Sequence, residues 1–211
     1  MRITKYEHAC FVASIGDKKL VVDPGSFTVP LPDSTNVVAV VVTHEHADHW
    51  TPEHLDRIKQ NSPDVRFFGP AGVAAAATDF EFTVVKDGET VEADPFTLEF
   101  FGEKHAQIHA SIPIVDNVGV LINDSVYYPG DSFTLGPVGV DLLAVPASAP
   151  WLKIGEVMDY VAEAKPKKSF ATHDMINSVI GNGMAGQRIG AVTQQGGGEF
   201  VTLAPGESVE L

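Results

Sequence analysis

Short apolar runs separated by turn residues are the main pattern along the chain. Val37–Val42 is a continuous apolar run, which is typical of a strand buried on both faces. Gly16-Asp17 separates two other runs and predicts a hairpin. The pattern predicts strands at Cys10–Ile15, Lys19–Val22, Val37–Val42, Arg66–Gly69, Phe82–Val85, Thr90–Ala93, Phe96–Phe101, Gly119–Ile122, Val126–Tyr128, Leu142–Val145 and Lys168–Thr172.

Helices are predicted at fewer places. Thr51 is a suitable N-cap, with Pro52 at the first helical position and His54–Lys59 continuing the helix. Ala71–Ala77 is a short Ala-rich helix, and Gly155–Ala164 has the apolar spacing of an amphipathic helix. Because the strands come in two batches, each followed by helices, we expect two β-sheets packed together with helices outside them.

Length and charge narrow the function classes. The chain has 211 residues, which predicts a single domain over 1–211. Its 14 basic and 28 acidic side chains give a formal net charge of −14, which argues against nucleic acid or an anionic membrane as the main partner. The start of the chain lacks the apolar segment of a signal peptide, and Val37–Val42 is too short to span a bilayer. We therefore expect a cytoplasmic protein.

Cys10 is the lone cysteine, which excludes an intrachain disulfide and a thiolate metal cluster. Histidine is the more informative residue type, because five of the eight histidines fall in two tight clusters. The run His44-Glu45-His46-Ala47-Asp48-His49 directly follows the predicted strand Val37–Val42. Imidazoles and carboxylates suit zinc and other first-row metals. In a loop at a strand end, positions i and i+2 converge on one ion and positions i+4 and i+5 on a neighbouring one, so the run predicts two adjacent metal sites.

Three further candidate ligands each follow a predicted strand. His105 comes after Phe96–Phe101, Asp131 after Val126–Tyr128, and His173 after Lys168–Thr172. Strand ends gathered on one edge of a sheet sandwich bring distant residues together on rigid supports. These residues are therefore expected to complete the sites.

The His-x-His-x-Asp-His run, the later histidine, Gly130-Asp131-Ser132 and Thr172-His173 together resemble the metallo-β-lactamase-fold superfamily over essentially the whole chain. Asp23, in an Asp-Pro-Gly turn, also matches that superfamily. The stretch Tyr128-Pro129-Gly130-Asp131 resembles its branch of metal-dependent hydrolases that includes L-ascorbate-6-phosphate lactonase. The resemblance implies an α+β fold, a four-layer αβ/βα sandwich of two β-sheets with helices on the outer faces. This fold carries many chemistries, so it does not fix the substrate.

The resemblance also implies a ligand set: His44, His46 and His105 for the first ion, Asp48, His49 and His173 for the second, and Asp131 as the bridge. Asp48 and Asp131 become the candidate catalytic residues, with Asp48 accepting a proton during attack. His105 is preferred over His109 because it lies nearer the strand end. His109 is then a support of a ligand, a substrate-pocket residue or a surface imidazole.

Other residues have alternative interpretations. Asp23 either orients a ligand or the motif loop, or only forms an Asx-turn. Lys153, in the loop Pro150-Trp151-Leu152-Lys153, either binds a small anionic substrate at the site mouth or is solvated. His8, assigned to a strand, and His54, on a helix, are interpreted as structural or solvated.

The expected cofactors are two divalent ions. Zinc is the first choice, and manganese and iron are the alternatives. Such ions supply hydroxide at neutral pH. The expected function is a metal-dependent hydrolase in which a hydroxide held between the ions attacks a small ester-type substrate, a lactone or related cyclic ester. The alternatives are a small-molecule phosphodiesterase, a non-catalytic metal-binding protein and a mononuclear iron oxidoreductase. A small molecule is the expected partner. The sequence does not indicate the oligomeric state, and a homo-oligomer is one alternative because relatives in this branch often associate.

Overall fold

Two seven-stranded sheets lie at the centre of the computed structural model, which describes residues 1–211. The first sheet contains, from edge to edge, β14 (Ser208–Glu210), β1 (Arg2–Lys5), β2 (Phe11–Ile15), β3 (Lys18–Val22), β4 (Val37–Val41), β5 (Arg66–Gly69) and β6 (Phe82–Val84). The second contains β13 (Glu199–Phe200), β12 (Lys168–Thr172), β11 (Leu142–Pro146), β10 (Val126–Tyr128), β9 (Gly119–Ile122), β8 (Phe96–Phe101) and β7 (Thr90–Ala93).

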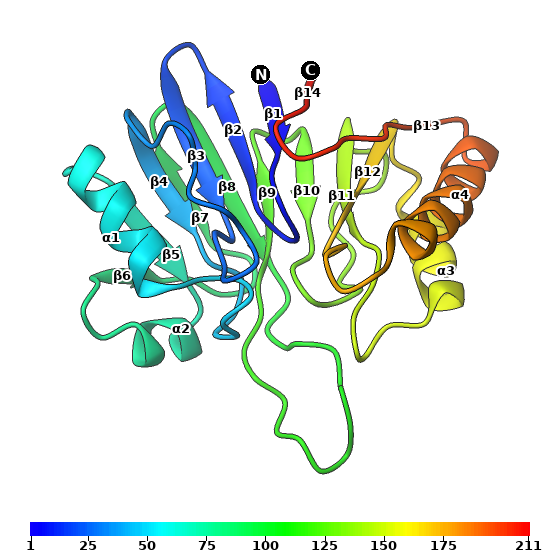
Figure 1. The fold of residues 1–211 in the computed structure, drawn as a ribbon, viewed down its shortest axis with the longest axis horizontal. Helices are drawn as coiled ribbons and strands as arrows, with labels where there is room; N and C mark the ends of the chain where they lie inside the picture. The colour runs from blue at the N-terminus through cyan, green and yellow to red at the C-terminus, as the bar shows by residue number, and fades with distance from the viewer.

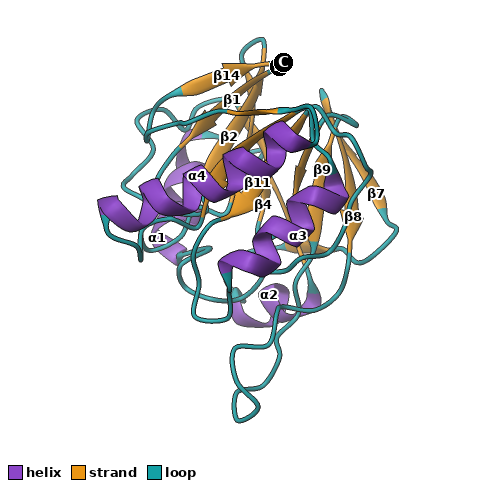
Figure 2. Ribbon diagram, turned by 90° about the vertical axis from the view of Figure 1, so that its right-hand side faces the viewer, coloured by secondary structure: helices purple, strands orange, loops and turns teal.

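The helices lie on the outer faces of the two sheets (Figure 1). They are α1 (Pro52–Asn61), α2 (Ala71–Ala76), α3 (Ile154–Ala164) and α4 (Val179–Gln195). Helices α1 and α2 cover the first sheet, and α3 and α4 run side by side across the second (Figure 2). None of the four combines the length and apolar character that crossing a bilayer requires.

Three separate apolar cores hold these layers together. The largest, with 21 buried residues, lies between the sheets and includes Phe11, Phe96 and Phe170. A second packs the first sheet against α1 and α2, and a third packs the second sheet against α3 and α4. Two sheets with apolar residues on both faces bury their surface only when helices cover the outside. The predicted α+β fold, a four-layer αβ/βα sandwich, is confirmed.

Strand direction places the chemistry-bearing loops. In the first sheet, β1 and β3 are both antiparallel to β2, and β4 is parallel to β3, so these three strands point the same way. In the second, β8 and β10 are both antiparallel to β9, and β11 and β12 are parallel to β10. The carboxyl ends of β1, β3 and β4 therefore share one edge of the first sheet, and those of β8, β10, β11 and β12 share one edge of the second.

Most predicted elements match the structure within one or two residues. The predicted strand Val37–Val42 is β4, and its residues are almost all buried. The hairpin predicted at Gly16-Asp17 joins β2 to β3. The Oγ1 atom of Thr51 accepts a hydrogen bond from the backbone N–H of His54 at 3.3 Å, so Thr51 is the N-cap of α1.

Helix α4 was not predicted, because its sequence carries two signals against a helix. Its apolar residues follow no clear helical face, and each glycine in a helix costs about 1 kcal/mol relative to alanine. The packing explains two of the glycines. A Cβ atom on Gly186 or Gly190 would lie 3.3 or 3.2 Å from the Phe200 side chain, so their absence lets that ring pack onto the helix. Tertiary packing therefore stabilises a helix that local propensity disfavours.

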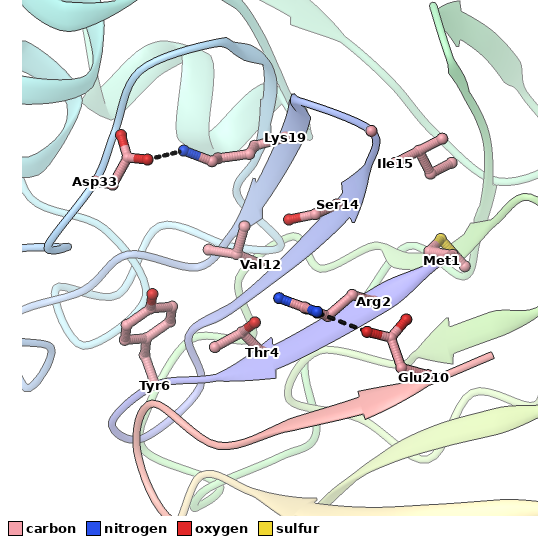
Figure 3. Close-up of a pocket in the computed structure, with 11 residues that line it drawn as sticks. Met1, Arg2, Thr4, Tyr6, Val12, Ser14, Ile15, Lys19, Asp33 and Glu210 are labelled. Carbon is pink, nitrogen blue, oxygen red and sulfur yellow. Dashed lines mark hydrogen bonds and ion pairs between the residues drawn. The ribbon is translucent and has the colours of Figure 1, made fainter.

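Residues of β1, β2 and β3 line a cavity of about 540 Å³ (Figure 3). Two ion pairs border this cavity, Arg2 with Glu210 at 2.6 Å and Lys19 with Asp33 at 2.5 Å. None of the predicted site residues lines it. The histidine cluster lies elsewhere, at the strand ends.

Candidate metal centre

The seven predicted ligand residues lie close together, where the carboxyl ends of strands from the two sheets meet. They come from the loops after β4, β8, β10 and β12. Their donor atoms form groups in which all atoms lie within 4.8 Å of one another: His44, His46 and His105; His8, Asp48, His49 and His173; and His44, His49 and Asp131. The first two groups divide the residues as the resemblance implied, with His8 as an addition. Asp131 lies between them, 3.4 Å from the Nε2 atoms of His49 and His105 and 3.1 Å from that of His173.

One ring nitrogen of each buried histidine is fixed by a hydrogen bond pointing away from the centre. The Nδ1 atom of His49 donates to Oδ2 of Asp23 at 2.7 Å. Those of His105 and His173 donate to the backbone carbonyls of Ala106 and Ser148. A neutral imidazole with its proton on Nδ1 keeps the Nε2 lone pair free.

The hydroxyl of Thr43 fixes the fourth ring. It donates its hydrogen to Asp23 at 2.7 Å, so its oxygen accepts from Nδ1 of His44 at 3.1 Å. The Nε2 atom of His44 then lies 3.1 Å from Nδ1 of His46. Two imidazole nitrogens face the same point, as they would around a shared cation.

Four buried polar atoms at the centre have no hydrogen-bond partner: the Nε2 atoms of His49, His105 and His173, and Oδ1 of Asp131. Buried polar groups in proteins are almost always paired, and each exception needs an explanation. The three Nε2 atoms face Asp131 from rings whose Nδ1 nitrogen makes a hydrogen bond. This is the arrangement that holds a histidine for metal ligation, so the residues present fit divalent ions.

The electrostatics also favour a cation. Burial and the neighbouring His49 hold the pKa of His44 well below its usual range, so this ring is neutral. Burial alone would lower the pKa of His173, but the carboxylates of Asp131 and Asp48 outweigh it and raise the pKa to about 10. Burial would raise the pKa of Asp131, yet the imidazoles of His49 and His173 hold it well below the normal value. The carboxylates thus stabilise positive charge at the centre.

The side chain of Asp23 holds both ends of the loop that carries the His44–His49 motif, through Thr43 and His49. It is fully buried, and its oxygens accept the Thr43 backbone N–H at 2.8 Å, the Thr43 hydroxyl, and Nδ1 of His49. Its φ angle of 46° places it in the left-handed region. Of the two interpretations of Asp23, the contacts favour the residue that orients a neighbouring imidazole.

Gly25 lets the motif loop approach this turn. A Cβ atom at this position would lie 1.8 Å from the carbonyl oxygen of Asp48. We expect Gly25→Ala to destabilise the protein by about 1–3 kcal/mol through overpacking. Chemical denaturation would measure this. Gly155→Ala is the control, because nothing lies within 4 Å of its added methyl group, and equal stability losses in both variants would contradict the prediction.

Asp131 is held by two side chains that were not predicted to do so. Its backbone N–H donates to Oδ1 of the buried Asn117 at 3.0 Å. Its Oδ2 atom accepts a hydrogen bond from Nε1 of Trp151 at 2.9 Å. The Trp151 ring also packs edge-on against His105. The loop after β11 therefore reaches the centre itself and is more than a wall at its mouth.

The structure separates His105 from His109. The base of the loop between β8 and β9 is closed by Lys104 and Asp116, whose side chains lie 2.8 Å apart. His105 follows directly, is buried, and faces His44 and His46. His109 lies further along the loop and is exposed, and its side chain bonds only to Ser111. His105 is therefore the ring that lies in the cluster, and its role as the metal ligand stays a prediction.

Lys153 does not touch the cluster. Its ammonium group is largely exposed and lies 3.4 Å from the Glu156 carboxylate. It does line a cavity of about 390 Å³, together with Ala106 and Trp151. Since these two residues adjoin His105 and Asp131, the cavity opens beside the first ligand group.

His8 was wrongly assigned to a strand. Strand β1 ends at Lys5, and His8 lies in the turn before β2 with a φ angle of 59°. It is fully buried against Asp48 and His173. The signal that could have found it is its position just beyond the carboxyl end of a strand, the position that all the other site residues share. His54 does lie on α1, buried, with Nε2 2.9 Å from the Thr28 carbonyl oxygen.

The sequence of this chain is similar to those of known proteins. Residues 2–173 match the model of a family described as the beta-lactamase superfamily domain. Protein Rv0786c of Mycobacterium tuberculosis (strain ATCC 25618 / H37Rv) is 31% identical over 181 residues, which cover 83% of this chain and 85% of that protein.

Two solved structures share the fold at low identity. Igni18, a metallo hydrolase from the archaeon Ignicoccus hospitalis, superposes with a TM-score of 0.71 at 15% identity, covering 99% of this chain and 97% of its own. CmlA, a diiron β-hydroxylase from Streptomyces venezuelae, gives 0.70 at 16% identity; the match covers all of this chain but only 54% of CmlA. Since the family match includes every predicted ligand residue and the chain has the matching sandwich fold, the protein belongs to the beta-lactamase superfamily and has the metallo-β-lactamase fold.

Proposed function

We propose that this protein is a metal-dependent hydrolase that uses two divalent ions. One observation carries the proposal: anchored imidazoles from three loops direct unpaired, buried Nε2 atoms at a shared carboxylate from a fourth. His44, His46 and His105 would hold one ion, and Asp48, His49 and His173 the other, with Asp131 between them. When bound, such ions lower the pKa of water and polarise an oxygen of the substrate.

The protein residues supply position and charge. The anchored Nδ1 atoms fix the rings, so little reorganisation is needed when ions bind. Asp48 is the most accessible of the acidic donors, with 25% of its side chain exposed. A carboxylate at the open side of the centre is suited to accept a proton from the attacking group, and we assign that role to Asp48.

The adjoining cavity suits a small molecule. Its volume of about 390 Å³ lies at the lower end of the range for ligand pockets. Trp151 and Phe133 offer apolar contact, and Lys153 stands at the rim as a cation. We propose a small ester-type substrate, a lactone or related cyclic ester, on the basis of the branch resemblance. A small phosphodiester is the second candidate, because the Lys153 cation would serve a phosphate equally well.

Metal identity and substrate are tested together. The chelated protein would be reloaded separately with zinc, manganese or iron(II), its metal content measured, and each form assayed on panels of lactones and phosphodiesters. We expect two ions per chain and lactone hydrolysis that disappears on chelation. Hydrolysis of phosphodiesters alone would favour the second candidate. Fewer than one ion per chain, with no ester hydrolysed, would refute the two-metal hydrolase.

The first ion is tested by a matched pair of histidine variants. His105→Ala is expected to reduce the bound metal to about one ion per chain, because this ring contributes one of three nitrogens to its group. His109→Ala removes an imidazole four positions away on the same loop, and we expect unchanged metal content. The reverse result would show that His109 is the ligand.

A further inference from the structure

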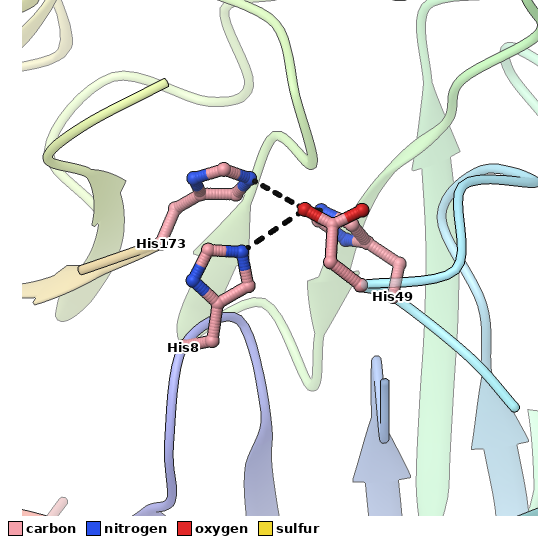
Figure 4. Close-up of side chains that lie close together, drawn as sticks. His8, His49 and His173 are labelled. Carbon is pink, nitrogen blue, oxygen red and sulfur yellow. Dashed lines mark hydrogen bonds and ion pairs between the residues drawn. The ribbon is translucent and has the colours of Figure 1, made fainter. Parts of the chain in front are cut away.

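His8 is a buried histidine that the proposed ligand set does not use. It lies in the turn between β1 and β2, is fully buried, and has a positive φ angle. Figure 4 shows its ring beside that of His173, and the centroid of the His49 ring lies 6.0 Å from that of His8. A polar side chain in this position, with an uncommon backbone conformation, calls for an explanation in terms of its contacts.

His8 contacts two of the proposed ligand residues at once. Its Nε2 atom lies 3.1 Å from Oδ2 of Asp48, and the Nε2 atom of His173 lies 3.4 Å from the same oxygen. Its backbone carbonyl accepts the N–H of His173 at 2.8 Å. Its ring packs on that of His173, with centroids 3.9 Å apart, and edge-on against Phe27.

The second ring nitrogen identifies the tautomer. The backbone N–H of Met175 points at Nδ1 of His8 over 3.4 Å, so Nδ1 is an acceptor. The proton of the neutral ring is then on Nε2, which donates to Asp48. An Nε2 atom that carries a hydrogen has no lone pair for a metal ion. The contacts therefore make His8 a donor to a ligand carboxylate.

Asp48 is the carboxylate that most needs such a support. A quarter of its side chain is exposed, whereas the side chains of His49, Asp131 and His173 are at most 4% exposed. Asp131 is fixed by Trp151, and the side chain outside the proposed ligand set that hydrogen-bonds to Asp48 is His8. Without that bond, Asp48 would contact only other proposed ligand residues, such as His173 with its Nε2 atom at 3.4 Å.

We propose that His8 is a positioning residue for the second ion: its Nε2–H holds Asp48, and its carbonyl holds the His173 backbone, in the geometry that the ion requires. This inference rests on the proposed function, in that the second donor group must bind metal. Partners of this kind change metal affinity by about 10–100-fold.

Two substitutions separate the hydrogen bond from the packing. His8→Phe keeps a ring against His173 and Phe27 but removes the donor, whereas His8→Gln retains an N–H donor near the Nε2 position. We expect His8→Phe to weaken binding of the second zinc ion about 10–100-fold, with the first ion unchanged, and His8→Gln to restore most of the affinity. His8→Ala takes the place of His8→Phe if the larger ring prevents folding.

The measurement is titration of the chelated protein with zinc against a competing chelator, alongside thermal unfolding of the metal-free variants. His54→Ala is the control, since it removes another buried imidazole, one whose ring bonds to the Thr28 backbone carbonyl and to none of the proposed ligand residues. A merely structural His8 would lower metal-free stability and leave the second-ion affinity unchanged. Equal affinities in wild type, His8→Phe and His8→Gln would overturn the inference.

Cobalt substitution distinguishes direct ligation. A ligand histidine would change the absorption spectrum of the second cobalt ion in both variants, whereas a positioning residue leaves the His8→Gln spectrum like that of the wild type. A changed spectrum in His8→Gln would therefore overturn the inference in favour of ligation. If wild type itself binds no second ion, the proposed function fails first, and that outcome is distinct from a failure of His8 alone.

Discussion

Replacing Asp131 with asparagine is expected to abolish stable binding of one ion and to lower hydrolysis on the order of 10²–10³-fold. The side chain is only 4% exposed, and three imidazole Nε2 atoms surround its carboxylate within 3.4 Å. Asparagine has nearly the same shape, and its carbonyl oxygen can still accept the Trp151 hydrogen bond. The change thus removes mainly the charge and one acceptor oxygen.

Metal content per chain and hydrolysis rates of the reloaded protein test this prediction. Asp141→Asn is a matched control, because Asp141 lies directly before β11, at its amino end, and pairs with Lys167 at 2.7 Å. We expect the control to keep full metal content. If Asp131→Asn also retained two ions and normal turnover, Asp131 would not bridge them.

Asp23→Ala is expected to cost several kcal/mol of stability and about 10–100-fold in metal affinity. Three donors, two from Thr43 and one from His49, lose their acceptor in a fully buried position. Each unpaired buried donor costs about 1–3 kcal/mol. Loss of the carboxylate also frees Nδ1 of His49, so the ring is no longer held with its Nε2 atom toward the centre.

Denaturant unfolding of the metal-free protein and zinc titration measure the two effects separately. Asp23→Asn keeps one carbonyl acceptor and the side-chain volume, so we expect a smaller loss of stability than for alanine. Its amide nitrogen would face either Thr43 or His49, and metal affinity should fall between wild type and Asp23→Ala. A stable Asp23→Ala protein with wild-type zinc affinity would show that Asp23 only forms a turn.

Local signals predicted most of the strands and the motif that carries the chemistry. Val37–Val42 lies between layers and must be apolar on both faces, so its sequence is unambiguous. The His44–His49 run follows it directly, and spacing alone divides its donors between two neighbouring points. The same holds for Thr51 and Pro52, because an N-cap depends on adjacent residues.

Long-range packing accounts for what the sequence did not predict. Helix α4 is rich in glycine, and two of its glycines accommodate the side chain of Phe200 from strand β13. His8 lies next to Asp48, forty positions away in the chain, only because β1 and β4 point the same way in one sheet. Trp151 similarly reaches Asp131 from the loop after a neighbouring strand. A pattern of neighbouring residues cannot predict these contacts, because each joins residues that are far apart in the chain.

Periodicity, the spacing of neighbouring residues and a resemblance in motif were enough to predict the strand-rich sandwich, the two batches of elements and the seven candidate metal ligands. Only the folded chain shows which nitrogen of each histidine faces the centre, that His105 is buried and His109 exposed, and that His8, Thr43, Asn117 and Trp151 contact the candidate ligands. These features depend on hydrogen bonds between strand-end loops. Such bonds form only when the two sheets pack with the carboxyl ends of these strands close together.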